Sequence, residues 1–209
     1  MQRVPSPTRG LTQPERVEIS SRRLVEAAAE LIVEKGWEAT TAAEIGRRAG
    51  YSRAMVHARY GSKDAILDAF FLHDYVKQLS PDADPDASGL QEAIGHFDRV
   101  RRLFSDDQDF LRAMFVATFE GVKTTSPLRE RVQRWLKRGV DKVEAGLRRG
   151  VDDGSVRADV DIDRATSDLS AAIFGAAYLW TVLADGYDLD RELTYVRDRF
   201  IRDYGATAR

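Results

Sequence analysis

The sequence predicts an all-α protein of about nine helices, and three observations support this fold class. Apolar residues recur every three or four positions through most of the 209 residues, as they do along one face of a helix. Ser, Thr and Asp residues suited to helix N-caps precede these segments, and several of them form capping boxes. The polar and apolar alternation that is typical of strands is rare, so we expect negligible strand content.

The first helix is expected after a disordered N-terminal arm, residues 1–14, which contains three prolines and no periodic apolar pattern. Gly36 is suited to end this helix. The apolar residues at helical spacing between these limits are Val17, Leu24, Ala28, Leu31 and Ile32.

Three further helix starts fall within the next 22 residues or so. Thr41 and Glu44 form a capping box that opens a short second helix. Gly50 supplies a turn, after which Ser52 is expected to cap a third helix through about residue 59. Ser62 should cap a fourth helix, which we expect to continue to about residue 79.

Five more helices are expected beyond residue 80. Capping-box patterns at 88–91 and 105–108 should open two of them. Ser126 before Pro127 should open a helix that runs to about Arg149. A polar turn then precedes the last two helices, which we expect over 163–184, with a cap near Asp163, and over 188–204.

Composition and charge restrict the function. The chain has no cysteine and three scattered His, so disulfides, thiol catalysis, a metal site and a cofactor are not expected. No signal-like segment or membrane-spanning apolar run of roughly 18 residues is present, which favours a cytoplasmic protein without a membrane partner. The net charge is −2, yet residues 40–63 contain five basic residues and one acidic residue. A local positive surface is therefore expected there.

The second and third helices, joined by a glycine turn and with the third one basic, have the pattern of a helix-turn-helix motif. The segment from Arg22 to Leu67 resembles the DNA-binding domain of the tetracycline-repressor (TetR) family. The features that carry the resemblance are paired alanines in the first helix, Gly36-Trp37, Thr40-Thr41, Ile45, Ala49-Gly50-Tyr51-Ser52 and Tyr60-Gly61-Ser62-Lys63.

The resemblance implies a transcriptional regulator rather than an enzyme. Residues 15–67 would form the helix-turn-helix domain, and residues 68–209 a larger helical domain for effector binding and dimerisation. Such a protein would act most often as a repressor that binds a palindromic double-stranded DNA operator as a homodimer. A small, largely hydrophobic effector would release it.

The same resemblance suggests which residues contact DNA. Thr41 and Lys63 would each meet a backbone phosphate, and Arg53 would contact a guanine in the major groove. The third helix departs from the family pattern at His57, Arg59 and Tyr60. The complete expected set is Thr41, Arg48, Ser52, Arg53, Ala54, Met55, His57, Arg59 and Lys63. The alternative is that the arginines lie on a solvated face, paired with Glu38 or Glu44, and that the serines are helix caps alone.

Aromatic residues are frequent in the middle of the chain, and the resemblance implies that some of them line an effector cavity. The expected lining residues are His96, Phe97, Phe110, Met114, Thr118, Trp135, Phe174 and Tyr178. The alternative is that these residues form an ordinary core.

The last two helices carry apolar residues at steps of four and three, the spacing of helical-bundle seams. Because a helix-turn-helix protein that binds two half-sites needs a second copy, we expect these helices to form a dimer interface. The expected interface residues are Leu169, Ile173, Ala176, Trp180, Leu183, Leu193, Val196 and Phe200. The alternative is that one seam packs inside the monomer.

Two other functions stay open at this stage. An all-α enzyme would use His96 and the acidic loop at residues 82–86, although no recognisable nucleophile, metal spacing or phosphate loop supports it. A ligand sensor that does not bind DNA would act through a protein partner instead.

Overall fold

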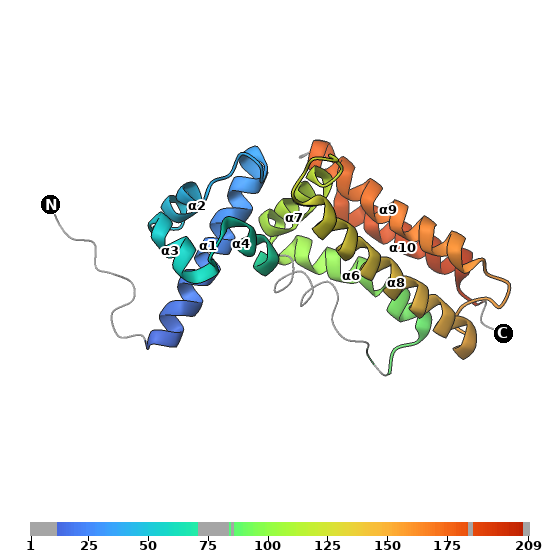
Figure 1. Cartoon of the computed structure of the whole chain (residues 1–209). Coiled ribbons are helices and arrows are strands. Elements are labelled where there is room, and N and C mark those ends of the chain that lie inside the picture. The colour runs from blue at the N-terminus through green and yellow to red at the C-terminus, as the bar shows by residue number, and fades with distance from the viewer. Residues whose placement is uncertain (1–11, 71–83, 85, 184–185, 207–209) are drawn as a thin grey trace. The chain divides into compact units, whose positions relative to one another are not determined.

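The computed structural model describes residues 12–70, 84, 86–183 and 186–206 (Figure 1). Within these residues the protein contains nine helices, and the extended pairing described there is a single bridge between Val156 and Gly205. The chain divides into two compact units, residues 1–73 and 74–209. Among the helices of the described ranges, none has the length and apolarity that crossing a bilayer requires.

The first unit contains α1 (Gln13–Lys35), α2 (Ala42–Arg48), α3 (Arg53–Tyr60) and α4 (Lys63–Ala69). α1 begins inside the expected N-terminal arm, because Thr12 and Glu15 form a capping box that the sequence analysis did not single out. The expected caps at Thr41 and Ser62 are confirmed by hydrogen bonds to the backbone of Glu44 and Ala65. The continuation of α4 to residue 79 lies outside the described residues.

α2 and α3 are held at close approach by glycine. Gly46 lies under the turn, where a Cβ atom would be 2.7 Å from the carbonyl oxygen of Ser52. Gly50 has a φ of +78°, and the amide of Tyr51 donates to the carbonyl of Gly46 over 2.7 Å. A side chain at Gly46 would force the two helices apart. The core beneath them consists of Leu24, Ile32, Trp37, Ile45, Val56, Ile66 and Leu67.

The second unit contains five helices. They are α6 (Gly89–Asp106), α7 (Gln108–Glu120), α8 (Arg129–Asp153), α9 (Ile162–Leu183) and α10 (Leu189–Tyr204). α6 packs against α7, α8 and α10, while α9 packs against α7, α8 and α10. Three of these helices, α6, α8 and α9, form the walls of the cavity described below.

One end of α6 touches α8 through backbone atoms. A Cβ atom on Gly89 would lie 2.0 Å from the amide nitrogen of Gly150 and 2.4 Å from the carbonyl oxygen of Gly146. Asp153, near the end of α8, accepts the amide of Gly89 over 2.7 Å, and Ser155 accepts the amide of Leu90 over 3.1 Å. Both bonds satisfy amides at the start of α6 that have no partner within the helix.

Several expected boundaries in this unit are corrected. The capping box at 88–91 is confirmed, but Ser105 lies inside α6, and Asp107 caps α7 by accepting the amide of Phe110 over 2.9 Å. Because the helix before it continues through residue 106, Ser105 has no free helix start to cap.

The boundaries of α8 also differ from expectation, whereas those of α9 agree to within one residue. α8 begins at Arg129, since the Ser126 hydroxyl accepts the amide of Leu128 in a turn that precedes the helix. α8 then runs through residues 150–153 of the expected turn and ends at Gly154, which is left-handed. The expected cap by an Asp near Asp163 is confirmed, because Asp161 accepts the amide of Arg164 over 2.9 Å.

Candidate functional site

The N-terminal half of α3 presents an exposed surface. Ser52, Arg53 and Ala54 are exposed and Met55 is half-buried, whereas Val56 is fully buried against the core. Arg53 makes no hydrogen bond or ion pair with any residue in the described ranges. Its guanidinium therefore projects from the unit as an uncommitted cation. We call Ser52, Arg53, Ala54, Met55 and His57 the α3 surface.

Local capping explains how this surface is held. Ser52 occupies the N-cap position of α3, but its hydroxyl makes no capping hydrogen bond. The predicted N-cap position is thus confirmed, but the capping hydrogen bond from the Ser52 side chain is not formed. At the other end, the exposed His57 ring contacts the carbonyl of Gly61 through Nδ1 over 2.9 Å. Gly61 has a φ of +73° and ends the helix.

Thr41 is exposed, and its hydroxyl serves the α2 capping box. The hydroxyl donates to Glu44 Oε2 over 2.7 Å and accepts the Glu44 amide over 3.3 Å. Lys35 of α1 donates to the other Glu44 oxygen over 2.6 Å. The hydrogen bonds from Lys35 and then from Thr41 lower the pKa of Glu44 from 4.5 to about 2. These bonds fix the start of α2 to the end of α1.

Arg48 is bound by α1. Its NH1 group lies 2.9 Å from Glu30 and 2.7 Å from Glu34, and its NH2 group lies 2.8 Å from the second Glu34 oxygen. These contacts raise the pKa of Arg48 and lower that of Glu34. The partners differ from the Glu38 and Glu44 considered from the sequence. A phosphate contact by Arg48 would compete with two carboxylates.

Arg59 and Lys63 also bond within the unit. Arg59 Nε donates to the Ser20 hydroxyl over 2.8 Å, which joins α3 to α1. Lys63 Nζ donates to the carbonyl oxygens of Trp37 and Thr40 over 2.9 and 2.7 Å and lies 4.4 Å from the centre of the Trp37 ring. The structure therefore gives these two cations a role in holding the helices together.

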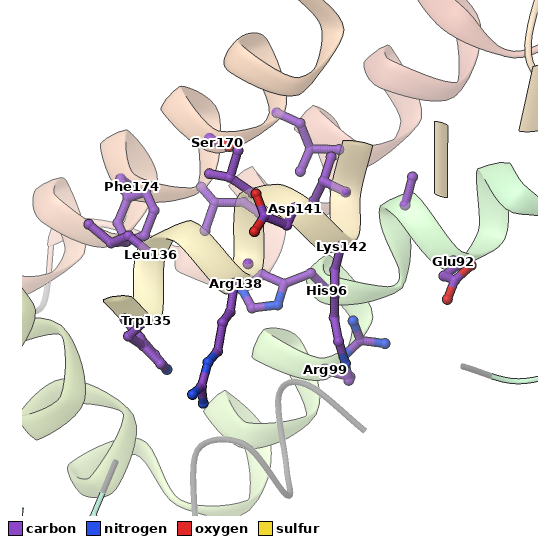
Figure 2. Close-up of a pocket in the computed structure, with 16 residues that line it drawn as sticks. Glu92, His96, Arg99, Trp135, Leu136, Arg138, Asp141, Lys142, Ser170 and Phe174 are labelled. Atoms are coloured by element: carbon purple, nitrogen blue, oxygen red, sulfur yellow. The ribbon is translucent and has the colours of Figure 1, made fainter. Parts of the chain in front are cut away.

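The second unit contains a cavity of about 360 Å³ between α6, α8 and α9 (Figure 2). Among the residues expected from the sequence, His96, Trp135 and Phe174 line it. Leu169 and Ile173, which were expected at a dimer interface, line it as well. The cavity walls combine apolar side chains with charged ones at the edge.

The other expected lining residues lie elsewhere. Phe97, Met114 and Thr118 are buried in the core, Phe110 is half-buried, and Tyr178 is exposed, and none of them lines the cavity. For Phe110, Met114 and Thr118 the physical reason is that α7 packs against α6 and α9 rather than along the cavity. Phe97 and Tyr178 lie on sides of α6 and α9 that do not line it. Sequence analysis missed the charged lining residues, which are Glu92, Arg99, Arg138, Asp141 and Lys142.

The expected dimer residues are mostly core residues of the monomer. Buried side chains cannot reach a second copy, and this applies to Leu169, Ile173, Ala176, Trp180, Leu193 and Phe200. Val196 is half-buried, and Leu183 is 52% exposed. The open apolar residues on the opposite face of α9 are Tyr178, Leu179, Val182 and Leu183, which we call the α9 stripe. Their spacing of three and four places them on one side of the helix.

A metal centre has no basis in the described part of the chain, where no cluster of three His, Asp or Glu side chains could hold an ion. The structure thus contains a helix-turn-helix unit with an exposed α3 surface and a separate helical unit with a cavity. This combination defines a class of protein with one unit suited to DNA and another suited to a small ligand.

Comparison with known proteins agrees with this class. A model of bacterial regulatory proteins of the tetR family matches residues 24–70, and a model of the tetracyclin repressor-like C-terminal domain matches residues 97–196. The HTH-type transcriptional regulator YdeS of Bacillus subtilis (strain 168), which is described as uncharacterised, is 26% identical over 188 residues. The match covers 88% of this chain and 87% of YdeS.

Solved structures share the fold. SmeT of Stenotrophomonas maltophilia in a complex with triclosan has a TM-score of 0.75 and 23% identity, covering 90% of this chain and 93% of SmeT. FadR of Bacillus subtilis with stearoyl-CoA has a TM-score of 0.70 and 19% identity, covering 86% and 97%. The chain belongs to the tetracycline-repressor (TetR) family. It is a DNA-binding transcriptional regulator with a C-terminal ligand-binding domain, and the family is not enzymatic.

Proposed function

We propose that the protein is a homodimeric repressor that binds a palindromic operator and is released by a small effector in the α6, α8 and α9 cavity. The domain limits expected from the sequence, residues 15–67 for DNA binding and 68–209 for effector binding and dimerisation, are kept in this proposal, except that the first domain includes α1 from Gln13 and its cap Thr12. The exposed, uncommitted Arg53 at the start of α3 is the observation that carries the proposal. A recognition helix contacts base edges through residues at its N-terminal end.

Arg53 is the residue that we assign to base recognition. An Arg side chain can donate two hydrogen bonds to guanine O6 and N7, which gives about 1–3 kcal/mol of discrimination. Ala54 and Met55 supply small and apolar neighbours suited to a thymine methyl group. Because Arg48, Arg59 and Lys63 already bond within the unit, we propose that they make weaker contacts with DNA phosphates than a free cation would. These contacts would use the N–H donors that the bonds within the unit leave over.

The α9 stripe supports dimerisation. Val182 is 60% exposed and Tyr178 is 53% exposed. Exposed apolar patches of this kind are typical of protein–protein interfaces. The exposed Gly175 is one turn before Tyr178, with nothing within 4 Å of a Cβ atom there. A second copy could therefore approach the helix backbone closely.

The first experiment is selection of bound DNA from random duplexes at fixed salt concentration. We expect recovery of a short palindrome, as two copies of α3 would contact two half-sites. Arg53→Ala should lower affinity for the selected duplex by at least about tenfold. Arg102→Ala, which removes an exposed and unpaired arginine in the described part of α6, is the matched control and should leave affinity unchanged. Failure to enrich any sequence would instead favour a ligand sensor without DNA binding.

The second experiment measures the association state. Val182→Glu places a charge in the α9 stripe and should convert a dimer to a monomer in sedimentation equilibrium. Val122→Glu is the control, because Val122 is 73% exposed but follows α7. If the wild-type protein is a monomer, or if both variants stay dimeric, the stripe is not the interface.

A further inference from the structure

The cavity is lined by more cationic than acidic side chains. Arg99 of α6 and Arg138 and Lys142 of α8 are cations, whereas Glu92 and Asp141 are acids. A site for a purely hydrophobic molecule has no need of three cations at its edge. Their presence raises the question of which charges remain for a ligand.

Both acids are bound by cations that do not line the cavity. Arg149 NH1 lies 2.9 Å from Glu92 Oε2, and Lys137 Nζ lies 2.8 Å from each oxygen of Asp141. Arg149 and Lys137 are absent from the cavity lining. Since each acid already has a partner outside the cavity, neither acid neutralises Arg138.

Helix geometry gathers the cations on one side. Arg138 and Lys142 are four residues apart on α8, which places them on the same face. In Figure 2, Arg99, Arg138 and Lys142 extend to the side away from Ser170 and Phe174. Arg138 makes no hydrogen bond or ion pair with any residue of the described segments, so its five N–H donors are available to a ligand.

The remaining wall is apolar and has space. Leu136 and Val140 of α8 face the cavity with Leu169, Ile173 and Phe174 of α9. Gly139 also lines it, and a Cβ atom at that position would meet nothing within 4 Å. The volume of about 360 Å³ is near the lower end of the roughly 300–1,000 Å³ typical of small-molecule sites. A compact ligand body therefore suits the cavity.

We propose that the effector is a compact amphipathic organic anion, with an apolar body against α9 and an acidic group bound by Arg138 together with Arg99 and Lys142. The inference rests on the proposed function, in which this cavity is the effector site. A guanidinium binds a carboxylate, sulfonate or phosphate through two parallel hydrogen bonds, and such bonds are stronger than neutral ones. A neutral ligand would gain nothing from the exposed charge of Arg138, and a cationic ligand would be repelled by it.

The test compares two fluorescent dyes with the same aromatic body, anilinonaphthalene sulfonate and the uncharged phenylnaphthylamine. Saturable fluorescence titration of the full chain should show that the sulfonate binds at least about tenfold more tightly, a ratio equivalent to about 1.4 kcal/mol. Arg138→Gln should remove most of this preference by weakening the sulfonate, while the affinity of the neutral dye changes by less than about twofold.

Two further variants locate the effect. Arg134→Gln removes an exposed arginine one turn earlier on α8, which pairs with Glu130 and does not line the cavity, and it should keep the preference. Gly139→Phe fills the cavity without removing a charge and should weaken both dyes. Thermal unfolding by circular dichroism confirms that each variant is folded.

The proposal is overturned if the neutral dye binds as tightly as the sulfonate, if neither dye saturates, or if Arg138→Gln leaves the preference intact. None of these titrations contains DNA. If the wild-type protein binds operator DNA but does not prefer the sulfonate dye, the anionic effector is rejected and the proposed repressor is not. If the wild-type protein prefers the sulfonate dye but binds no operator DNA, the proposed repressor is rejected and the anionic ligand site is not.

Discussion

The two units use their charged side chains differently. In the first unit, Arg48, Arg59 and Lys63 bond to α1 or to the connection between α1 and α2, and Arg53 is left to face outward. In the second unit, Glu92 and Asp141 at the cavity are bound by cations outside it. A cluster of charge in a sequence marks a functional region in both cases. The fold decides which member of the cluster remains available.

Glycine has two different roles in these units. Gly46 in the first unit and Gly89 in the second allow backbone contact between helices. Gly139 in the second unit instead opens space along the cavity. The same substitution to alanine should therefore have opposite effects at these positions, and it tests the comparison directly.

The largest effect is expected for Gly89→Ala. The new Cβ atom would lie 2.0 Å from the Gly150 nitrogen, and backbone atoms on two helices would have to move. We expect a loss of about 3 kcal/mol in the free energy of unfolding, measured by urea denaturation. A loss below about 0.5 kcal/mol would mean that α6 and α8 are not in backbone contact in solution.

The second-largest effect is expected for Gly46→Ala. The new Cβ atom would lie 2.7 Å from the Ser52 carbonyl oxygen, and we expect a loss of about 1–3 kcal/mol in the free energy of unfolding. Since α2 and α3 would separate, operator affinity should fall more than stability alone explains. Gel-shift titration at a temperature where the variant is fully folded measures this excess. Unchanged affinity there would show that the spacing of the two helices is not needed for recognition.

The sequence predicted the first unit more completely than the second. The capping boxes at Thr41 in the first unit and at Ser88 in the second depend on residues three apart, so local pattern was sufficient for both. The box at Ser105 was wrong because a better cap, Asp107, lies two residues on. The cavity draws its lining from three helices that are far apart in the chain, and no local pattern specifies that arrangement.

The apolar seam of α9 shows the same limit. This helix has apolar residues on more than one face, so periodicity identifies faces without ranking them. Packing against α7, α8 and α10 buries the face of Leu169 and Ile173 and leaves the α9 stripe outside. Arg53 was chosen correctly as an outward residue of α3, because the helix is short and Val56 fixes its buried side.

Gly139→Ala should have a smaller effect of opposite sign. The added methyl group meets nothing within 4 Å, and alanine favours the helical backbone over glycine. We expect a gain of about 0.5–1 kcal/mol in the free energy of unfolding. Differential scanning calorimetry should show a higher melting temperature, and a decrease would indicate that the cavity is closed in solution.

The smallest effect concerns acid. The folded pKa of Glu44 is lowered from 4.5 to about 2, so its stabilising contribution is present above pH 4.5 and is lost as the pH falls towards 2. Glu44→Gln should lower the melting temperature slightly at pH 7, and the difference from wild type should vanish near pH 2. A difference that is constant across this range would show that the Lys35 and Thr41 bonds do not depend on the carboxylate charge.

The backbone contact among Gly89, Gly146 and Gly150 makes the α6 and α8 pair asymmetric. The two helices are in backbone contact at the start of α6, and the cavity begins beside this contact at Glu92 and Ala93 and extends along α6 to His96 and Arg99. A ligand in the cavity would therefore displace α6 least at Gly89, where backbone atoms of both helices would have to move. We expect ligand binding to rotate α6 about the Gly89 contact. A small increase in cavity volume would then become a larger displacement of the far end of α6.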